Sequence, residues 1–128
     1  MNPKPLFALL LVSAGAFASG LSYEQAKTRA DRDEASLSAA QTGALIESQG
    51  AAAGDSFAKC PPTSSHPDLA PFTVVMELDA SGKVVRTWLK GNSAIAVCFN
   101  AGMSHKSLFK PPRAPFYTSF EMSWRQTQ

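Results

Sequence analysis

The stretch Phe72-Thr-Val-Val-Met-Glu-Leu-Asp79 decides the fold of this chain, because its side chains alternate between two faces. Every second residue from Phe72 to Leu78 is apolar, which is the pattern of a β-strand with one buried face. The next residues, Asp79-Ala-Ser-Gly-Lys83, supply a tight turn in which Gly82 can adopt a positive φ. Val84-Val-Arg-Thr-Trp-Leu-Lys90 then returns as a second strand. The sequence therefore predicts an antiparallel hairpin over residues 72–90.

Two further elements follow the hairpin. Gly91-Asn-Ser93 ends the second strand and offers a helix cap, and the apolar residues of 94–103 have helical spacing. After a proline-rich connector, Phe116-Tyr-Thr-Ser-Phe-Glu-Met-Ser-Trp124 alternates again and predicts a third, antiparallel strand. The expected fold class is α+β, in which one helix covers a small antiparallel sheet.

The region before the hairpin predicts one long, alanine-rich helix over residues 22–49. Ser22 and Gln25 form a capping-box pattern at its start, and the glycines of 50–54 suggest its end. Its apolar stripe is mostly alanine and is interrupted by Asp33 and Glu47. Such a face buries little area, so we expect this helix to act as a spacer or to meet a partner.

The first eighteen residues have the pattern of a secretory leader peptide. A single basic residue, Lys4, precedes a short apolar run that closes on Ala16-Phe-Ala18. We expect cleavage after Ala18 and export to the periplasm or the medium; an uncleaved anchor is the alternative. The organisation is therefore a leader at 1–18, a helical segment at 19–58 and an α+β domain at 59–128. No later stretch is apolar enough to predict a membrane span.

The two cysteines, Cys60 and Cys98, are predicted to form a disulfide, because an even pair in a small exported protein is usually oxidised. The bridge would stabilise the fold by roughly 4 kcal/mol through the loop that it closes. A reactive or metal-binding thiol is the alternative, since Cys98 and His105 lie seven residues apart.

The candidate catalytic and metal-binding groups are sparse. Two Ser-x-x-Lys tetrads, Ser56–Lys59 and Ser107–Lys110, have a spacing used by serine acyl enzymes, but the accompanying motifs of those enzymes are missing. The only histidines are His66 and His105, and a metal site would need both and a carboxylate such as Asp68. The sequence therefore predicts a protein that is not an enzyme and has no cofactor or metal. A small hydrolase remains the competing hypothesis.

Charge is distributed unevenly along the chain. The 128 residues are 45% hydrophobic and 17% charged with a net charge of +2, which is globular composition and gives no reason to expect a nucleic-acid partner. Residues 19–58 hold six acidic and three basic side chains, whereas residues 59–128 hold eight basic and four acidic ones. This basic surface favours an acidic partner, although ordinary solubility or folding-back of the acidic helix would also explain it. The candidate partner-binding residues are Arg86, Lys90, Lys106, Lys110, Arg113, Tyr117 and Arg125.

The order of motifs from residue 60 to 125 resembles the C-terminal domain of TonB-family envelope proteins. The resemblance rests on the strand from Phe72, the turn Ser81-Gly-Lys83, the cysteine-bearing helix and Phe109-Lys-Pro-Pro112 before the last strand. The Cys60/Cys98 pair is similar to a disulfide-bearing branch of that family. The resemblance implies a periplasmic binding or adaptor protein that engages an envelope protein, in some cases by strand addition. An inhibitor or immunity protein against a toxin or hydrolase is the alternative function, and a homodimer is an alternative partnership.

Overall fold

The computed structural model describes residues 20–61 and 64–124. The predicted leader peptide and Arg125 lie outside these ranges. The elements, in chain order, are α1 (Tyr23–Ala35), α2 (Ala39–Ala58), β1 (Phe72–Leu78), β2 (Val84–Lys90), α3 (Ala94–Met103) and β3 (Phe116–Met122). The α+β class, the hairpin, the helix after it and the third strand are confirmed.

The three strands form one antiparallel sheet in the order β2-β1-β3, so β1, the strand that begins at Phe72, is the central one. The turn that joins β1 to β2 is held by the Asp79 carboxylate, whose Oδ1 accepts hydrogen bonds from the backbone N–H groups of Ser81 and Lys83. Gly82 has a φ of 92°, as the turn requires. A register shift between Glu77 and Leu78 then places one extra residue in β2.

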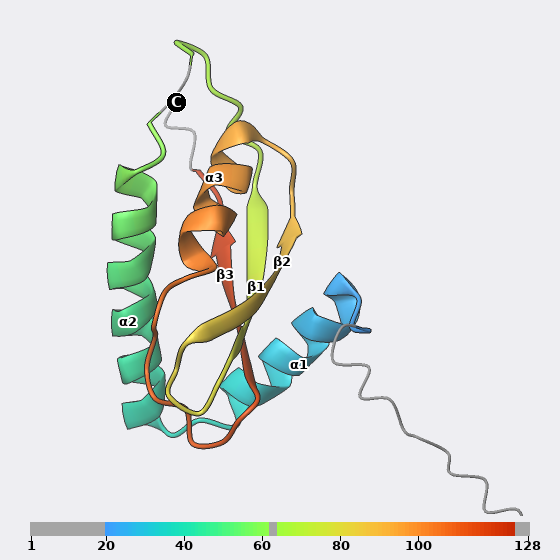
Figure 1. Cartoon of the computed structure of the whole chain (residues 1–128), viewed down its shortest axis with the longest axis vertical. Coiled ribbons are helices and arrows are strands. Elements are labelled where there is room, and N and C mark those ends of the chain that lie inside the picture. Colours follow the sequence, from blue (N-terminus) through green and yellow to red (C-terminus); the bar gives the residue numbers. More distant parts are fainter. Residues whose placement is uncertain (1–19, 62–63, 125–128) are drawn as a thin grey trace, which may run out of the picture.

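One face of the sheet carries the main core. Every second residue of β1 from Phe72 to Leu78 is buried there, as the alternation predicts. Phe99 of α3 is fully buried against this face, and its ring centroid lies 4.4 Å from that of Phe57 of α2. Figure 1 shows α2 and α3 lying side by side along this face of the sheet.

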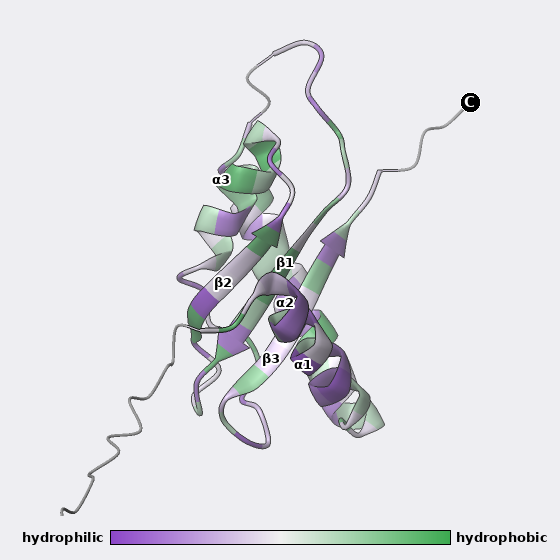
Figure 2. Ribbon diagram, turned by 90° about the vertical axis from the view of Figure 1, so that its right-hand side faces the viewer, coloured by the Kyte–Doolittle hydropathy of each residue, from purple (hydrophilic) through white to green (hydrophobic). Residues whose placement is uncertain are grey.

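The opposite face is covered by α1, which corrects the expectation of a single covering helix. Ala26 and Ala30 are fully buried, and they pack with Val75 of β1 and Tyr117 of β3. Their small side chains let this hydrophilic helix approach the strands closely. Figure 2 shows α1 and α3 on opposite sides of the sheet. The fold is therefore three layers, with helices on both faces of the strands.

The single helix predicted over residues 22–49 is instead two helices. Ser36 ends α1, and Ser38 begins α2 with a second capping box that pairs with Gln41. The expected end near Gly50 is also wrong, because α2 continues to Ala58. Packing explains the continuation: Ala52, Ala53 and Ser56 are buried on the side of α2 that faces the protein. The break between the helices lets α1 and α2 reach opposite faces of the sheet.

Candidate functional site

The outer edge of β3 is closed by side chains from the two N-terminal helices. The backbone N–H of Tyr117 donates to Oδ2 of Asp33 at 3.0 Å, and that of Ser119 donates to Oε1 of Glu34 at 2.7 Å. Gln49 Nε2 donates to the carbonyl oxygen of Ser119 at 3.3 Å. We call Asp33, Glu34 and Gln49 the β3 clasp. The clasp satisfies the edge groups that a further strand would otherwise pair with.

The β3 clasp is itself held in place. Arg113 Nη2 lies 3.0 Å from Oδ1 of Asp33, whose side chain is only 6% exposed. Thr118 Oγ1 donates to Oε1 of Glu34 at 2.9 Å and accepts from Gln49 Nε2 at 2.8 Å. A buried carboxylate with these partners stabilises the docked α1, because burying its charge alone would be costly.

Asp33, Glu34 and Gln49 were absent from the predicted site residues. The sequence did carry a signal for Asp33, because this residue interrupts the apolar stripe of its helix. A charge on an otherwise apolar face indicates a buried partner. Which partner it meets depends on the break between α1 and α2, which the periodicity did not predict.

The outer edge of β2 is closed only at its beginning. The backbone N–H of Val84 donates to the carbonyl of Lys106 at 2.9 Å, and that of Leu108 donates to the carbonyl of Gly82 at 2.8 Å. Lys106 is tethered in turn by a salt bridge from its ammonium to the Asp55 carboxylate of α2. We call residues 106–108 the β2 cover. Beyond Val84, no described segment pairs with the outer edge of β2.

The register identifies which amides of β2 point outward. In an antiparallel ladder, the N–H groups of successive residues point alternately to the two sides of the strand. Tyr117 and Ser119 point away from β1, so Thr118, opposite Met76, bonds to β1. Met76 therefore directs its own N–H and C=O groups toward β3, and its neighbour Val75 directs them toward β2. Trp88, which lies opposite Val75, consequently bonds inward to β1. Thr87 and Leu89 therefore direct their backbone N–H and C=O groups outward.

Cations and aromatic rings line the side of β2 that faces α1. The Lys90 ammonium lies 5.6 Å from the ring centroid of Tyr23, and the Arg86 guanidinium lies 5.8 Å from that of Trp88. Trp88 Nε1 donates to the carbonyl of Leu21 at 2.9 Å. A cavity of about 470 Å³ opens beside Tyr23 and Lys90 and continues to Thr73 and Glu121 at the end of the sheet. Arg86 and Lys90 therefore place positive charge beside the open part of the β2 edge, while Glu24 lines the same cavity as Lys90.

Folding disperses the other predicted partner-binding residues. Lys106 and Arg113 pair with Asp55 and Asp33, so part of the basic charge is neutralised by the acidic helices folding back. Tyr117 is 4% exposed and lies inside the protein rather than on a partner surface. Its hydroxyl donates to Glu77 at 2.8 Å, and burial raises the pKa of this phenol. Lys110 is exposed and closely follows a segment that bonds to the beginning of β2, whereas Lys90 lies at the other end of that strand.

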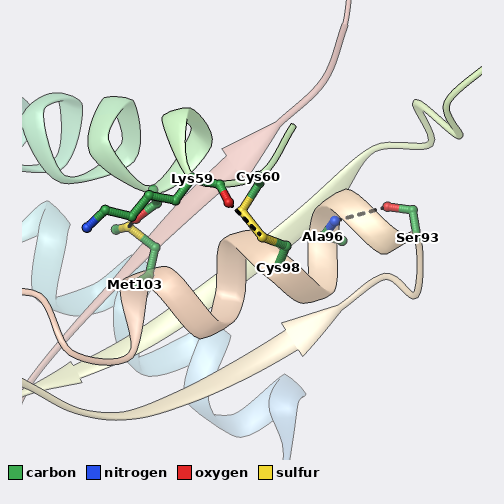
Figure 3. Close-up of a disulfide and its surroundings, with 7 residues drawn as sticks. Lys59, Cys60, Ser93, Ala96, Cys98 and Met103 are labelled. Atoms are coloured by element: carbon green, nitrogen blue, oxygen red, sulfur yellow. Dashed lines mark hydrogen bonds between the residues drawn. A yellow bond between two sulfur atoms is a disulfide. The ribbon is translucent and has the colours of Figure 1, made fainter. Parts of the chain in front are cut away.

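Cys60 and Cys98 form the predicted disulfide, which joins the end of α2 to the middle of α3 (Figure 3). The Cys98 sulfur also lies 3.8 Å from the carbonyl oxygen of Lys59. Cys98 is therefore not available as a thiol in this structure. The bridge fixes the spacing of the two helices that cover the core face.

The structure does not assemble the candidate catalytic groups. Ser56 is fully buried, and its hydroxyl contacts the Met103 sulfur at 3.4 Å. Lys59 pairs with Asp55 at 3.2 Å. Ser107 lies in the β2 cover rather than in a helix, so the Ser107–Lys110 tetrad lacks the helical geometry that this chemistry uses. His66 and His105 are both exposed.

No three histidine, cysteine, aspartate or glutamate residues among the described residues are grouped so as to hold a metal ion. None of the helices in residues 20–61 and 64–124 has the length and apolar character needed to cross a bilayer.

Comparison of the chain with known protein families, with curated proteins and with solved structures found no match.

Proposed function

We propose that this chain is a non-enzymatic, exported binding or adaptor protein that captures an envelope protein at the outer edge of β2. In this mode, an extended segment of the partner adds a strand to the sheet and bonds to the outward amides and carbonyls of Thr87 and Leu89. The single observation that carries the proposal is the difference between the two outer edges of the sheet: side chains of α1 and α2 bond to the edge of β3, whereas no strand of the described chain pairs with the outer backbone edge of β2 beyond Val84.

Two further features support the proposal. The Cys60–Cys98 disulfide is compatible with an oxidising compartment such as the periplasm. The order hairpin, helix and strand matches the order on which the resemblance to TonB C-terminal domains rests. Membership of that family, export and the periplasmic location remain part of the proposal.

The test compares two substitutions at one position of β2. Thr87→Pro removes the outward N–H, and proline is tolerated at edge strands where that group faces solvent. Thr87→Ala removes only the side chain and serves as the matched control. The oxidised proteins are used to capture partners from an envelope extract, and the bound proteins are identified by mass spectrometry. We expect the parent and Thr87→Ala to retain the same partner and Thr87→Pro to lose it.

A measurement on the parent protein keeps the proposal falsifiable if Thr87→Pro does not fold. Hydrogen exchange at the amides of Thr87 and Leu89 must slow when the captured partner is added. Unchanged exchange in the complex, or undiminished capture by a folded Thr87→Pro protein, contradicts strand addition at β2. A captured toxin or hydrolase that is inhibited in a one-to-one complex assigns the protein to the inhibitor class.

A further inference from the structure

The surroundings of the β2 edge indicate what kind of segment it accepts. No acidic side chain occurs in the sequence between Asp79 and Glu121, so β2 and α3 carry no negative charge. Arg86 and Lys90 project from β2 on the side that faces α1, where their cations lie over aromatic rings. Glu77, opposite Arg86 in the register, is the nearest acidic residue of β1 and accepts the Tyr117 hydroxyl hydrogen bond.

The other side of the same edge is apolar. Cys98 and Gly102 of α3 face α2, because they contact Cys60 and Ser56 respectively. The helical turn of about 100° per residue places Val97 and Asn100 on the opposite flank of α3, toward β2. Val97 is 54% exposed. Asn100 Oδ1 is buried and has no hydrogen-bond partner in the described part of the chain.

The two elements run in opposite directions from Gly91, so their levels can be matched. The rise is about 1.5 Å per residue along a helix and about 3.3 Å along a strand. A Cβ atom at Gly91 would lie 3.7 Å from that of Ala96, so these two residues are level, Asn100 lies close to the level of Leu89, and Val97 lies close to that of Lys90. A strand added to β2 would therefore carry alternate side chains past the flank of α3 and past the cations on the α1 side.

We propose that the β2 edge selects an extended segment of another protein in which acidic and apolar residues alternate. The inference rests on the proposed strand addition and specifies the chemistry of the partner. The acidic side chains lie against Arg86 and Lys90, and the apolar ones pack on the Val97 flank of α3. Like charges placed opposite one another across a ladder are destabilising, so a second copy of β2 is a poor occupant, since it would bring its own Arg86 and Lys90 to the junction.

The experiment uses two synthetic peptides and the oxidised protein. One peptide of seven residues alternates glutamate with valine, and its matched control alternates lysine with valine. Amide chemical shifts report where each peptide binds, and titration gives its affinity. We expect shifts at Thr87 and Leu89 and an affinity for the acidic peptide that is about tenfold higher at about 0.1 M salt. Raising the salt to about 1 M, where the Debye length is about 3 Å, should remove most of that preference.

Charge reversal at two exposed lysines separates local from general electrostatics. Lys90→Glu changes the charge beside the open edge, whereas Lys110→Glu makes the same change beyond the β2 cover. Lys90→Glu should abolish the tenfold preference, and Lys110→Glu should leave it within about twofold, because charges farther apart than the Debye length of about 10 Å interact weakly.

The outcomes keep this inference separate from the proposed function. Equal affinity for both peptides, with shifts at Thr87 and Leu89, overturns the acidic preference and leaves strand addition intact. Failure of both peptides to shift these amides contradicts binding at this edge, and with it both proposals. Concentration-dependent broadening of the same amides without any peptide identifies a second copy as the occupant and overturns the choice of an acidic partner.

Discussion

The two edges of the sheet in this protein solve the same problem in different ways. An edge strand exposes unpaired N–H and C=O groups that invite pairing with other chains. At β3, carboxylates of Asp33 and Glu34 and the amide of Gln49 occupy those groups. At β2, the cover of residues 106–108 ends at Val84, and the remaining edge has no described partner. The comparison shows that the acidic N-terminal helices protect the edge of β3, whereas the open edge of β2 has the cations of Arg86 and Lys90 beside it.

Loss of the disulfide should have the largest effect on stability. The Cys60→Ser, Cys98→Ser double variant releases a loop with a sequence separation of 38 residues. We expect the free energy of unfolding in urea to fall by about 4 kcal/mol. The bridge joins α2, which contributes Gln49 to the β3 clasp, to α3, which flanks β2. In the folded variant, the amides at the β3 edge should nevertheless exchange more slowly than those at the β2 edge, because neither edge contains a cysteine.

The β2 cover can be tested at Gly82. A Cβ atom at this position would overlap the carbonyl oxygen of Phe109, and the positive φ adds backbone strain. Gly82→Ala should therefore lower the free energy of unfolding by about 3 kcal/mol. Gly50→Ala is the matched control, since the added Cβ on α2 would meet nothing within 4 Å beyond the adjacent residues and backbone of its own helix. That control should gain about 0.5–1 kcal/mol from helix propensity. Equal effects of the two variants would contradict the close crossing at Gly82.

The β3 clasp can be broken by Asp33→Ala. This change leaves the N–H of Tyr117 without its acceptor and Arg113 without its buried carboxylate. We expect a loss of about 2–3 kcal/mol in the free energy of unfolding and faster exchange of the Tyr117 amide. Asp31→Ala removes a carboxylate from the exposed side of α1, where the side chain is 60% exposed, and should cost less than about 0.5 kcal/mol. An Asp33→Ala protein as stable as Asp31→Ala would mean that the clasp contributes nothing.

The smallest effect is the pH dependence of the β2 cover. Lys106, followed by Lys59, holds the pKa of the Asp55 carboxyl below its ordinary value. A carboxyl with a lowered pKa in the folded state stabilises the fold above its unfolded pKa of about 3.9, and loses this contribution as the pH falls through the folded value. The protection of the Val84 amide, measured relative to its intrinsic exchange rate at each pH, should therefore fall below about pH 4. Asp55→Asn should show the faster exchange already at neutral pH.

Much of the sheet could be predicted from the sequence, whereas its covering could not. The alternation from Phe72 to Leu78 and the Gly82 turn are local patterns, and both appear in the structure as expected. The disulfide followed from the count of cysteines. The second covering layer was missed because α1 docks through two alanines, which give almost no hydrophobic signal. The β3 clasp was missed because its contacts join residues 84 and 85 positions apart in the chain.

The basic residues illustrate the same limit. Their number predicted a positive surface, but only the fold decides which of them face acidic partners within the chain. Arg113 and Lys106 are paired with the N-terminal helices, whereas Lys90 lies at the open edge. The number of basic residues therefore predicts that a positively charged surface exists, and the register of the sheet shows that it lies beside the open edge of β2.

Amide hydrogen exchange of the isolated, oxidised protein tests the central claim most directly. The account predicts slow exchange at Tyr117 and Ser119, whose N–H groups are held by the β3 clasp. It predicts exchange at Thr87 and Leu89 that is faster by at least about a hundredfold, because a group open to solvent exchanges without local unfolding. Protection of Thr87 and Leu89 equal to that of Tyr117 and Ser119 would contradict the account, because both edges would then be closed.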